Sequence, residues 1–136
     1  ALHQNPTAWD PWLLFFLRAV DEQARENMRR AAAMQRLYKE LQTEFPIITN
    51  SASCGLLLDA IFESPIFSKP IISGRIHEVN TATIHRMINS LLDAGILHMR
   101  TNGAGRRAAT YQLRELSLIA QGLPIERFDY YPCMLT

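Results

Sequence analysis

The stretch ATIHRMINSLLDAGILHMRTNGAGRRAATYQL, residues 82–113, carries most of the information about the fold of this chain. Its first part has apolar side chains at helical spacing, which places them on one face of a helix: Ile84, Met87, Ile88, Leu91 and Leu92. Gly95 can adopt the left-handed conformation that ends a helix. Two strand-like runs follow, residues 96–100 and 110–113, joined by a loop rich in glycine and arginine. The stretch therefore predicts a helix followed by a β-hairpin.

A helix followed by a two-stranded hairpin is typical of the second half of a winged helix-turn-helix domain. Such a domain usually presents its second helix to the DNA major groove and its hairpin, the wing, to a neighbouring phosphate or minor groove. From Arg86 to Arg114 the chain has five arginines and one acid, Asp93. The predicted DNA-binding residues on the start and polar face of the helix and on the wing are Thr81, Thr83, His85, Arg86, Asn89, Arg100, Arg106, Arg107 and Arg114.

Composition limits the kind of protein this is. The chain has 136 residues, of which 48% are hydrophobic and 20% charged, enough for one domain with a packed core and an added helix. The net charge is only +1, so attraction to nucleic acid must come from local charge. The start of the chain lacks signal-peptide features, and the apolar run 12–17 is too short to cross a bilayer. These features predict a cytoplasmic protein that does not enter a membrane.

The N-terminal third predicts one long helix. Asp10 followed by Pro11 is a strong helix start, and no proline or glycine then occurs until Pro46. Apolar side chains recur every three or four residues at Leu13, Leu17, Val20, Ala24, Met28, Ala31, Met34, Tyr38, Leu41 and Phe45. A helix from Pro11 to about Glu44 would be ~50 Å long. Pro46 is expected to end it.

The first turns of this helix, residues 12–17, are apolar on nearly every side, which predicts burial against another surface. Trp12, Phe15 and Phe16 are the candidate interface residues. Either the chain forms a homodimer through this helix, or another domain covers it. The later cluster of Arg25, Arg29 and Arg30 is expected to be a solvent face, because Asp21, Glu22 and Glu26 lie at ion-pair spacing.

The remaining segments complete a mainly α fold with a small β-hairpin. We expect a linker at 49–53, a short helix at 56–62, an extended edge segment between Pro65 and Pro70, and a second short helix at 71–79. Asn80 and Thr81 cap the helix of the central stretch, and residues 116–120 add a last helical turn. The predicted division is a connector helix (1–50), a winged-helix domain (51–122) and a tail (123–136) in which Phe128, Tyr130 and Tyr131 dock on the body.

The segment WDPWLLFFLRAVDEQA, residues 9–24, resembles the Trp-x-x-Trp-Leu-x-Phe-Phe-Leu-x-x-Val segment that closes the catalytic domain of many bacterial Fic-family (filamentation induced by cAMP) proteins. In longer members of that family a helical connector and a winged-helix domain follow. The family transfers AMP, or sometimes another nucleotide moiety, to a protein hydroxyl through a His-Pro-Phe-x-x-Gly-Asn-Gly-Arg loop, which this sequence lacks. The resemblance implies the non-catalytic C-terminal part of a Fic-like adenylyltransferase, with the catalytic domain in cis.

The residues themselves also predict no catalytic site, metal or cofactor in this chain. The four histidines form no i, i+4 pair, and no GxSxG, P-loop or GxGxxG motif occurs. Cys54 and Cys133 lie in no CxxC motif, which favours two ordinary thiols, with a disulfide left open. Three functions remain: a DNA-binding module, a module that dimerises, positions a Fic domain or recruits its protein substrate, and a purely structural piece.

Overall fold

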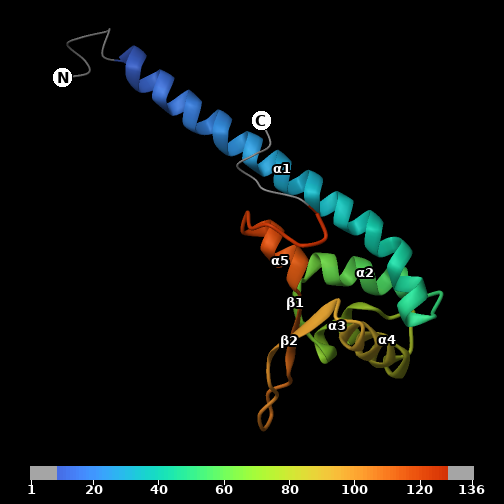
Figure 1. Cartoon of the computed structure of the whole chain (residues 1–136). Helices are drawn as coiled ribbons and strands as arrows, with labels where there is room; N and C mark the ends of the chain where they lie inside the picture. Colours follow the sequence, from blue (N-terminus) through green and yellow to red (C-terminus); the bar gives the residue numbers. More distant parts are fainter. Residues whose placement is uncertain (1–8, 129–136) are drawn as a thin grey trace.

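The computed structural model describes residues 9–128, which form a long helix and a folded C-terminal unit (residues 54–128). The elements in chain order are α1 (Trp9–Thr49), α2 (Cys54–Glu63), β1 (Ile66–Ser68), α3 (Lys69–Arg75), α4 (Thr81–Asp93), β2 (Leu97–Thr101), β3 (Thr110–Leu113) and α5 (Arg114–Ala120). Figure 1 shows α1 running past the C-terminal unit and extending well beyond it. The predicted mainly helical class with a long N-terminal helix is therefore confirmed.

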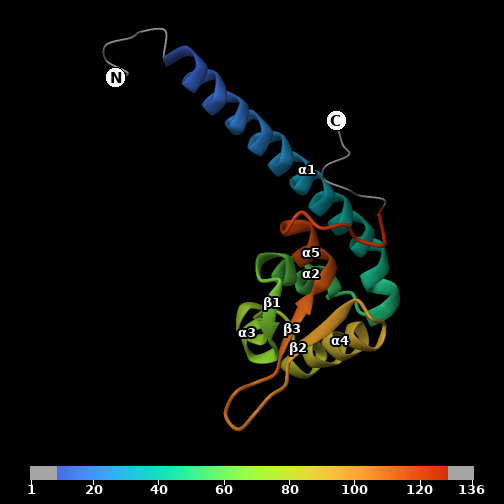
Figure 2. The same cartoon turned by 60° about the vertical axis from the view of Figure 1, so that its left-hand side comes forward.

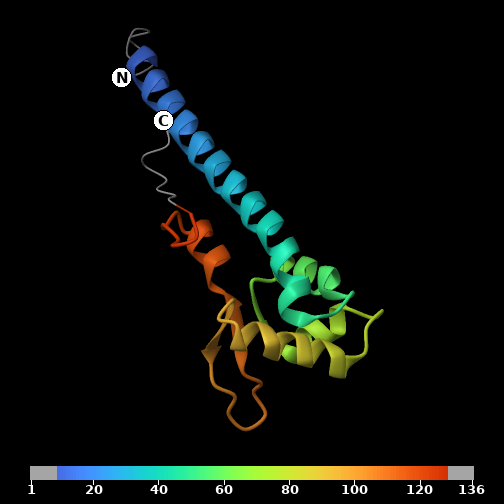
Figure 3. The same ribbon diagram turned by 45° about the vertical axis from the view of Figure 1, so that its right-hand side comes forward.

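The second half of α1 packs on the C-terminal unit through one face. Its buried residues follow one another at intervals of four and so lie along one side of the helix: Ala33, Leu37, Leu41, Phe45 and Thr49. Helices α2, α4 and α5 contact α1. The first half behaves differently, because every side chain from residue 10 to residue 25 is exposed. Figure 3 shows this half rising away from the C-terminal unit.

The predicted end of α1 was wrong by more than one turn, because Pro46 lies inside the helix. A proline removes one backbone hydrogen bond and crowds the carbonyl four residues earlier, at a cost of about 3 kcal/mol. Burial of Phe45 and Thr49 on the C-terminal unit offsets this cost. The helix ends at Thr49, and the next residue, Asn50, has a left-handed φ of 48° and an N–H that donates to the Pro46 carbonyl at 2.9 Å.

The sheet has three antiparallel strands in the order β1-β3-β2, with β3 in the centre (Figure 2). The β2–β3 pairing is the predicted hairpin, with Leu97 opposite Leu113 and Met99 opposite Tyr111. The extended segment between the two prolines forms β1 on the other side of β3, where Phe67 lies opposite Tyr111. Both rings are buried, which gives the sheet one apolar face.

The predicted helix 71–79 is shifted towards the N-terminus, since α3 spans Lys69–Arg75. Pro70 is tolerated in the first turn, where its missing N–H has no helical partner to lose. The chain leaves the helix at Ile76, an extended residue whose side chain is buried. The next helix begins as predicted, because the Asn80 side chain accepts a hydrogen bond from the Ala82 N–H at 2.8 Å.

The described part of the predicted tail is packed against the body. Ile125 and Phe128 are buried, and the Arg36 guanidinium lies 4.1 Å from the centre of the Phe128 ring. The predicted docking of Phe128 is thus confirmed, while Tyr130 and Tyr131 lie outside the described residues. Between these apolar anchors, Arg127 reaches back to acids on α1 and α5. Residues 125–128 therefore fasten α5 to α1.

Candidate nucleic-acid interface

Helix α4 has the amphipathic form that its sequence predicts. Ile84, Met87, Ile88 and Leu91 are fully buried against the rest of the C-terminal unit. Of the predicted site residues on this helix, Thr81, Arg86 and Asn89 are exposed. Thr83 and His85 are half-buried. The exposed side also includes Asp93, an acid that would repel a phosphate.

The Arg86 side chain makes a hydrogen bond within the protein. One of its guanidinium nitrogens donates to the backbone carbonyl of Thr49 at 3.0 Å. Thr49 is the last residue of α1, where helix carbonyls carry partial negative charge, so this contact ties the end of α1 to α4. The predicted base-reading role would require this hydrogen bond to break.

Replacing Arg86 with alanine is expected to lower the free energy of unfolding by about 1–2 kcal/mol, because the hydrogen bond to Thr49 has a charged donor and joins two elements. Urea unfolding followed by circular dichroism measures this change. Thr81→Ala is the matched control on the same exposed side, since no side-chain hydrogen bond of Thr81 is recorded in the described residues. A stability loss no larger than that of the control would show that Arg86 is free to contact DNA.

The other polar residues of α4 contact α3. The Ser73 hydroxyl and His85 Nε2 are 3.3 Å apart, and the Lys69 ammonium donates to the Asn89 amide oxygen at 2.8 Å. The sequence did not single out Lys69, because its partner lies 20 residues away and no local pattern connects them. Lys69 also lies 5.8 Å from the Tyr111 ring centre, so it adds a positive charge beside α4.

The β2–β3 hairpin presents the clearest basic surface. Its loop ends in a tight turn in which Ala104 and Arg107 exchange two backbone hydrogen bonds of 3.1 and 3.0 Å. Gly105 takes the first central position with a φ of +60°, a conformation that favours glycine. Arg106 therefore lies at the extreme tip and Arg107 directly after it. Figures 1 and 2 show this loop projecting away from the body of the protein.

Four predicted site residues belong to the hairpin or its immediate end: Arg100, Arg106, Arg107 and Arg114. All are exposed, and within residues 9–128 none has a recorded ion pair or side-chain hydrogen bond. Residues 94–114 contain no Asp or Glu at all. We call these four side chains the hairpin arginines. They form a region of uncompensated positive charge on a protein whose net charge is only +1.

Several arginines of α1 contrast with the hairpin arginines because acids of the same helix pair with them. Arg25 lies 3.0 Å from Asp21, and both Arg29 and Arg30 contact Glu26, at 3.6 and 3.0 Å. The predicted ion pairing of this cluster is confirmed. Arg30 also donates to the Ala120 carbonyl at 3.1 Å, so part of the cluster supports the contact between α1 and α5.

The candidate interface residues Trp12, Phe15 and Phe16 form a separate apolar surface near the start of α1. Trp12 and Phe16 stack with ring centres 5.6 Å apart, and Phe15 is 73% exposed. Figure 1 places this part of α1 at the opposite end of the molecule from the hairpin loop. The protein therefore has a basic end and an apolar end.

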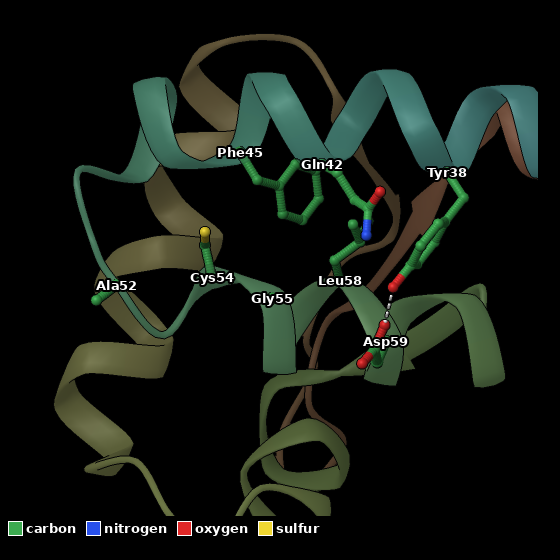
Figure 4. A pocket seen from close by; sticks show the side chains of 8 residues that line it. All are labelled: Tyr38, Gln42, Phe45, Ala52, Cys54, Gly55, Leu58 and Asp59. Carbon is green, nitrogen blue, oxygen red and sulfur yellow. Dashed lines mark hydrogen bonds between the residues drawn. The ribbon is translucent and has the colours of Figure 1, made fainter.

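A pocket of about 410 Å³ lies between α1 and α2 (Figure 4). The Tyr38 hydroxyl donates to the Asp59 carboxylate at 2.6 Å, and this hydrogen bond raises the pKa of Tyr38. Cys54, which has a buried free thiol, also lines this pocket. The lining includes no histidine that could activate the thiol, so the geometry gives no support for nucleophilic catalysis there.

Two further findings concern metals and membranes. In the part of the chain between residues 9 and 128, no cluster of three or more His, Cys, Asp or Glu side chains is arranged to bind a metal ion. Over the same residues, no helix combines the length and apolar character needed to cross a membrane.

Comparison of the chain with protein-family models, curated proteins and solved structures finds no match.

Proposed function

We propose that this chain is a winged-helix module that binds DNA through α4 and the β2–β3 hairpin. The element order α2-β1-α3-α4-β2-β3 and the sheet order β1-β3-β2 support this fold. In it, α3 and α4 would be the two helices of the helix-turn-helix, and the β2–β3 hairpin would be the wing. The apolar side of α4 is buried in the core and its polar side is exposed, as a groove-binding helix requires.

The observation that carries the proposal is the set of hairpin arginines. Four exposed guanidinium groups without recorded acidic partners, in a stretch with no acid, are well suited to phosphate oxygens. Arg25 and Arg30 of α1, by contrast, pair with acids of the same helix.

The hydrogen bonds that join α4 to α1 and α3 favour binding dominated by the DNA backbone. Arg86, His85 and Asn89 have hydrogen-bond partners in the protein, which leaves Thr81 as the predicted α4 residue that is exposed and free of recorded side-chain bonds. Phosphate contacts provide affinity and position, whereas base contacts provide sequence preference. We therefore expect similar affinity for duplexes of different sequence.

Fluorescence anisotropy with a labelled random duplex at several salt concentrations tests the proposal. Four phosphate contacts predict a slope of about −3 to −4 in a plot of log affinity against log salt. A second duplex of unrelated sequence should bind with nearly the same affinity. Absence of binding even at low salt would contradict the DNA-binding function.

A second function, protein interaction, is favoured by the exposed apolar surface of α1. Seven large apolar side chains between residues 12 and 20 are each more than 40% exposed, at Trp12, Leu13, Leu14, Phe15, Phe16, Leu17 and Val20. A contiguous patch of this kind usually marks an interaction site. The two functions are compatible because the apolar and basic surfaces lie at opposite ends of the molecule.

We further propose that the chain is the non-catalytic C-terminal region of a bacterial Fic-like adenylyltransferase. The support is the sequence of residues 9–24 followed by a connector helix and the proposed winged helix. In such a parent protein α1 would connect the catalytic domain to the C-terminal unit, which carries the basic hairpin.

A further inference from the structure

We propose that the exposed side of α1 forms an antiparallel two-helix seam with a second copy of this chain. The inference develops the interaction function proposed above and is independent of DNA binding. It rests on a row of residues along α1, here called the α1 seam, which consists of Leu13, Leu17, Val20, Ala24, Asn27, Ala31, Met34 and Tyr38.

The spacing of the α1 seam is the first argument. Its members alternate steps of four and three residues without interruption over 26 positions, from 13 to 38, which is the repeat of a coiled coil. Seven of the eight are apolar or aromatic, Asn27 being the polar one. At 1.5 Å per residue the seam is ~39 Å long.

The burial of α1 is the second argument, because the C-terminal unit leaves most of the seam uncovered and packs only against its far end, at Met34 and Tyr38. That unit buries Ala33, Leu37 and Leu41, whereas Leu17 and Val20 are 59% and 50% exposed. Met34 and Tyr38, at the far end of the seam, are only half-buried. An uncovered apolar face with heptad spacing is suited to packing against a second helix.

A groove at the far end of the seam favours the antiparallel direction. It has a volume of about 380 Å³ and is lined by Met34, Gln35, Tyr38, Lys39 and, from α2, Phe62. The Tyr38 and Phe62 rings meet edge to face at 5.2 Å. Apolar side chains of a second copy would fit this groove beside Met34, Tyr38 and Phe62, and the chain has them at the opposite end of α1.

In an antiparallel register, the apolar N-terminal end of each seam meets the groove of the other copy. With Leu13 opposite Tyr38 and Leu17 opposite Met34 of the second copy, Val20 faces Ala31 and Ala24 faces Asn27. Small side chains then meet near the two-fold axis, and the large ones lie at the ends where the groove gives room. Because the two-fold axis repeats every contact, each copy fills the groove of the other.

This register also brings opposite charges of the two copies close together. Trp12 comes opposite Lys39 of the second copy, which places Asp10 within about one helical turn of the same ammonium group. Asp10 and Lys39 are both exposed, and neither has a recorded ion pair in the described part of the chain. In a parallel pair the two C-terminal units would instead lie at the same end, both beside Met34 and Tyr38.

Sedimentation equilibrium of the whole chain tests whether the partner is a second copy of this chain. We expect a mass of twice 15.5 kDa at high micromolar concentration. Leu17→Asp should weaken dimerisation more than 100-fold, because the symmetric seam then buries two unpaired carboxylates. Met28→Asp is the matched control, since Met28 is a 72% exposed apolar side chain of the same helix that lies outside both the seam and the apolar surface at residues 12–20. A monomeric wild-type chain, or equal effects of the two variants, would overturn the proposal.

Cysteine cross-linking tests the direction of the seam, in a background carrying Cys133→Ser. The double variant Val20→Cys with Ala31→Cys is expected to form a covalent dimer on oxidation, while Val20→Cys alone is not. A dimer linked through Val20→Cys alone would show a parallel pair and overturn the register. A monomer that still binds DNA would refute the dimer and leave the DNA-binding function standing, with α1 covered by a domain in cis.

Discussion

Replacing Arg106 and Arg107 together with alanine is expected to weaken binding to a random duplex by about 10-fold to 100-fold at physiological salt and to reduce the salt slope by about 2. The two side chains lie at the tip of the β2–β3 hairpin, exposed and without recorded ion pairs in the described residues. Each is therefore available to displace one counterion from DNA. Anisotropy titrations at several salt concentrations measure both quantities.

The matched control is Arg25→Ala with Arg36→Ala, which removes the same charge from α1. Both arginines are exposed, but Asp21 and Glu40 of the same helix pair with them at 3.0 and 3.6 Å. We expect this variant to bind DNA with an unchanged salt slope. Equal losses in the two double variants would mean that net charge alone drives binding, and the hairpin would lose its assigned role.

Replacing Arg127 with alanine is expected to lower the free energy of unfolding by about 2–3 kcal/mol. Its guanidinium donates to both oxygens of Glu115, at 2.7 and 3.1 Å, and to Glu44, with Glu40 at 3.4 Å. The variant would leave three partly buried carboxylates without their shared cation. Partial solvent exposure of the network keeps the loss below that of a fully buried ion pair.

Urea unfolding measures this loss, and Arg127→Lys should restore only part of it because an ammonium group cannot make the paired contacts with Glu115. The hydrogen bonds with Glu115 and Glu44 raise the pKa of Arg127 above its usual value. For a cation with a raised pKa, the stabilisation persists below the pKa of the unfolded chain, so the difference between wild type and variant should be the same at pH 7 and pH 9. A loss under 0.5 kcal/mol, typical of a surface pair, would contradict the proposed fastening of α5 to α1.

The main helices and the hairpin were predictable because their signals are local. The spacing of Ile84, Met87, Ile88 and Leu91 identified α4, and all four are buried. Gly95 takes the expected left-handed conformation, with a φ of +79°, directly before the hairpin. The exposed positive charge of Arg106 and Arg107 was also predictable, since no acid lies near them in the sequence.

Local signals were misleading where tertiary packing outweighed them. Pro46 is a helix breaker by itself, yet burial of its neighbours Phe45 and Thr49 keeps the helix intact for another turn. The sequence analysis also joined most of the seam residues, together with Met28, to the buried Leu41 and Phe45 in a single apolar stripe. In the structure these belong to two faces, one packed on the C-terminal unit and one exposed.

The sequence by itself determined the order of helices and strands, the apolar side of α4, the basic hairpin and the apolar start of α1. The tertiary structure alone decided which polar side chains remain free to bind a ligand. Arg86 meets Thr49 across 37 residues and Arg127 meets Glu44 across 83, and no periodicity encodes such pairs. The physical reason is that helical spacing and turn preferences act between near neighbours, whereas a polar group takes whichever partner the completed fold brings within hydrogen-bond distance.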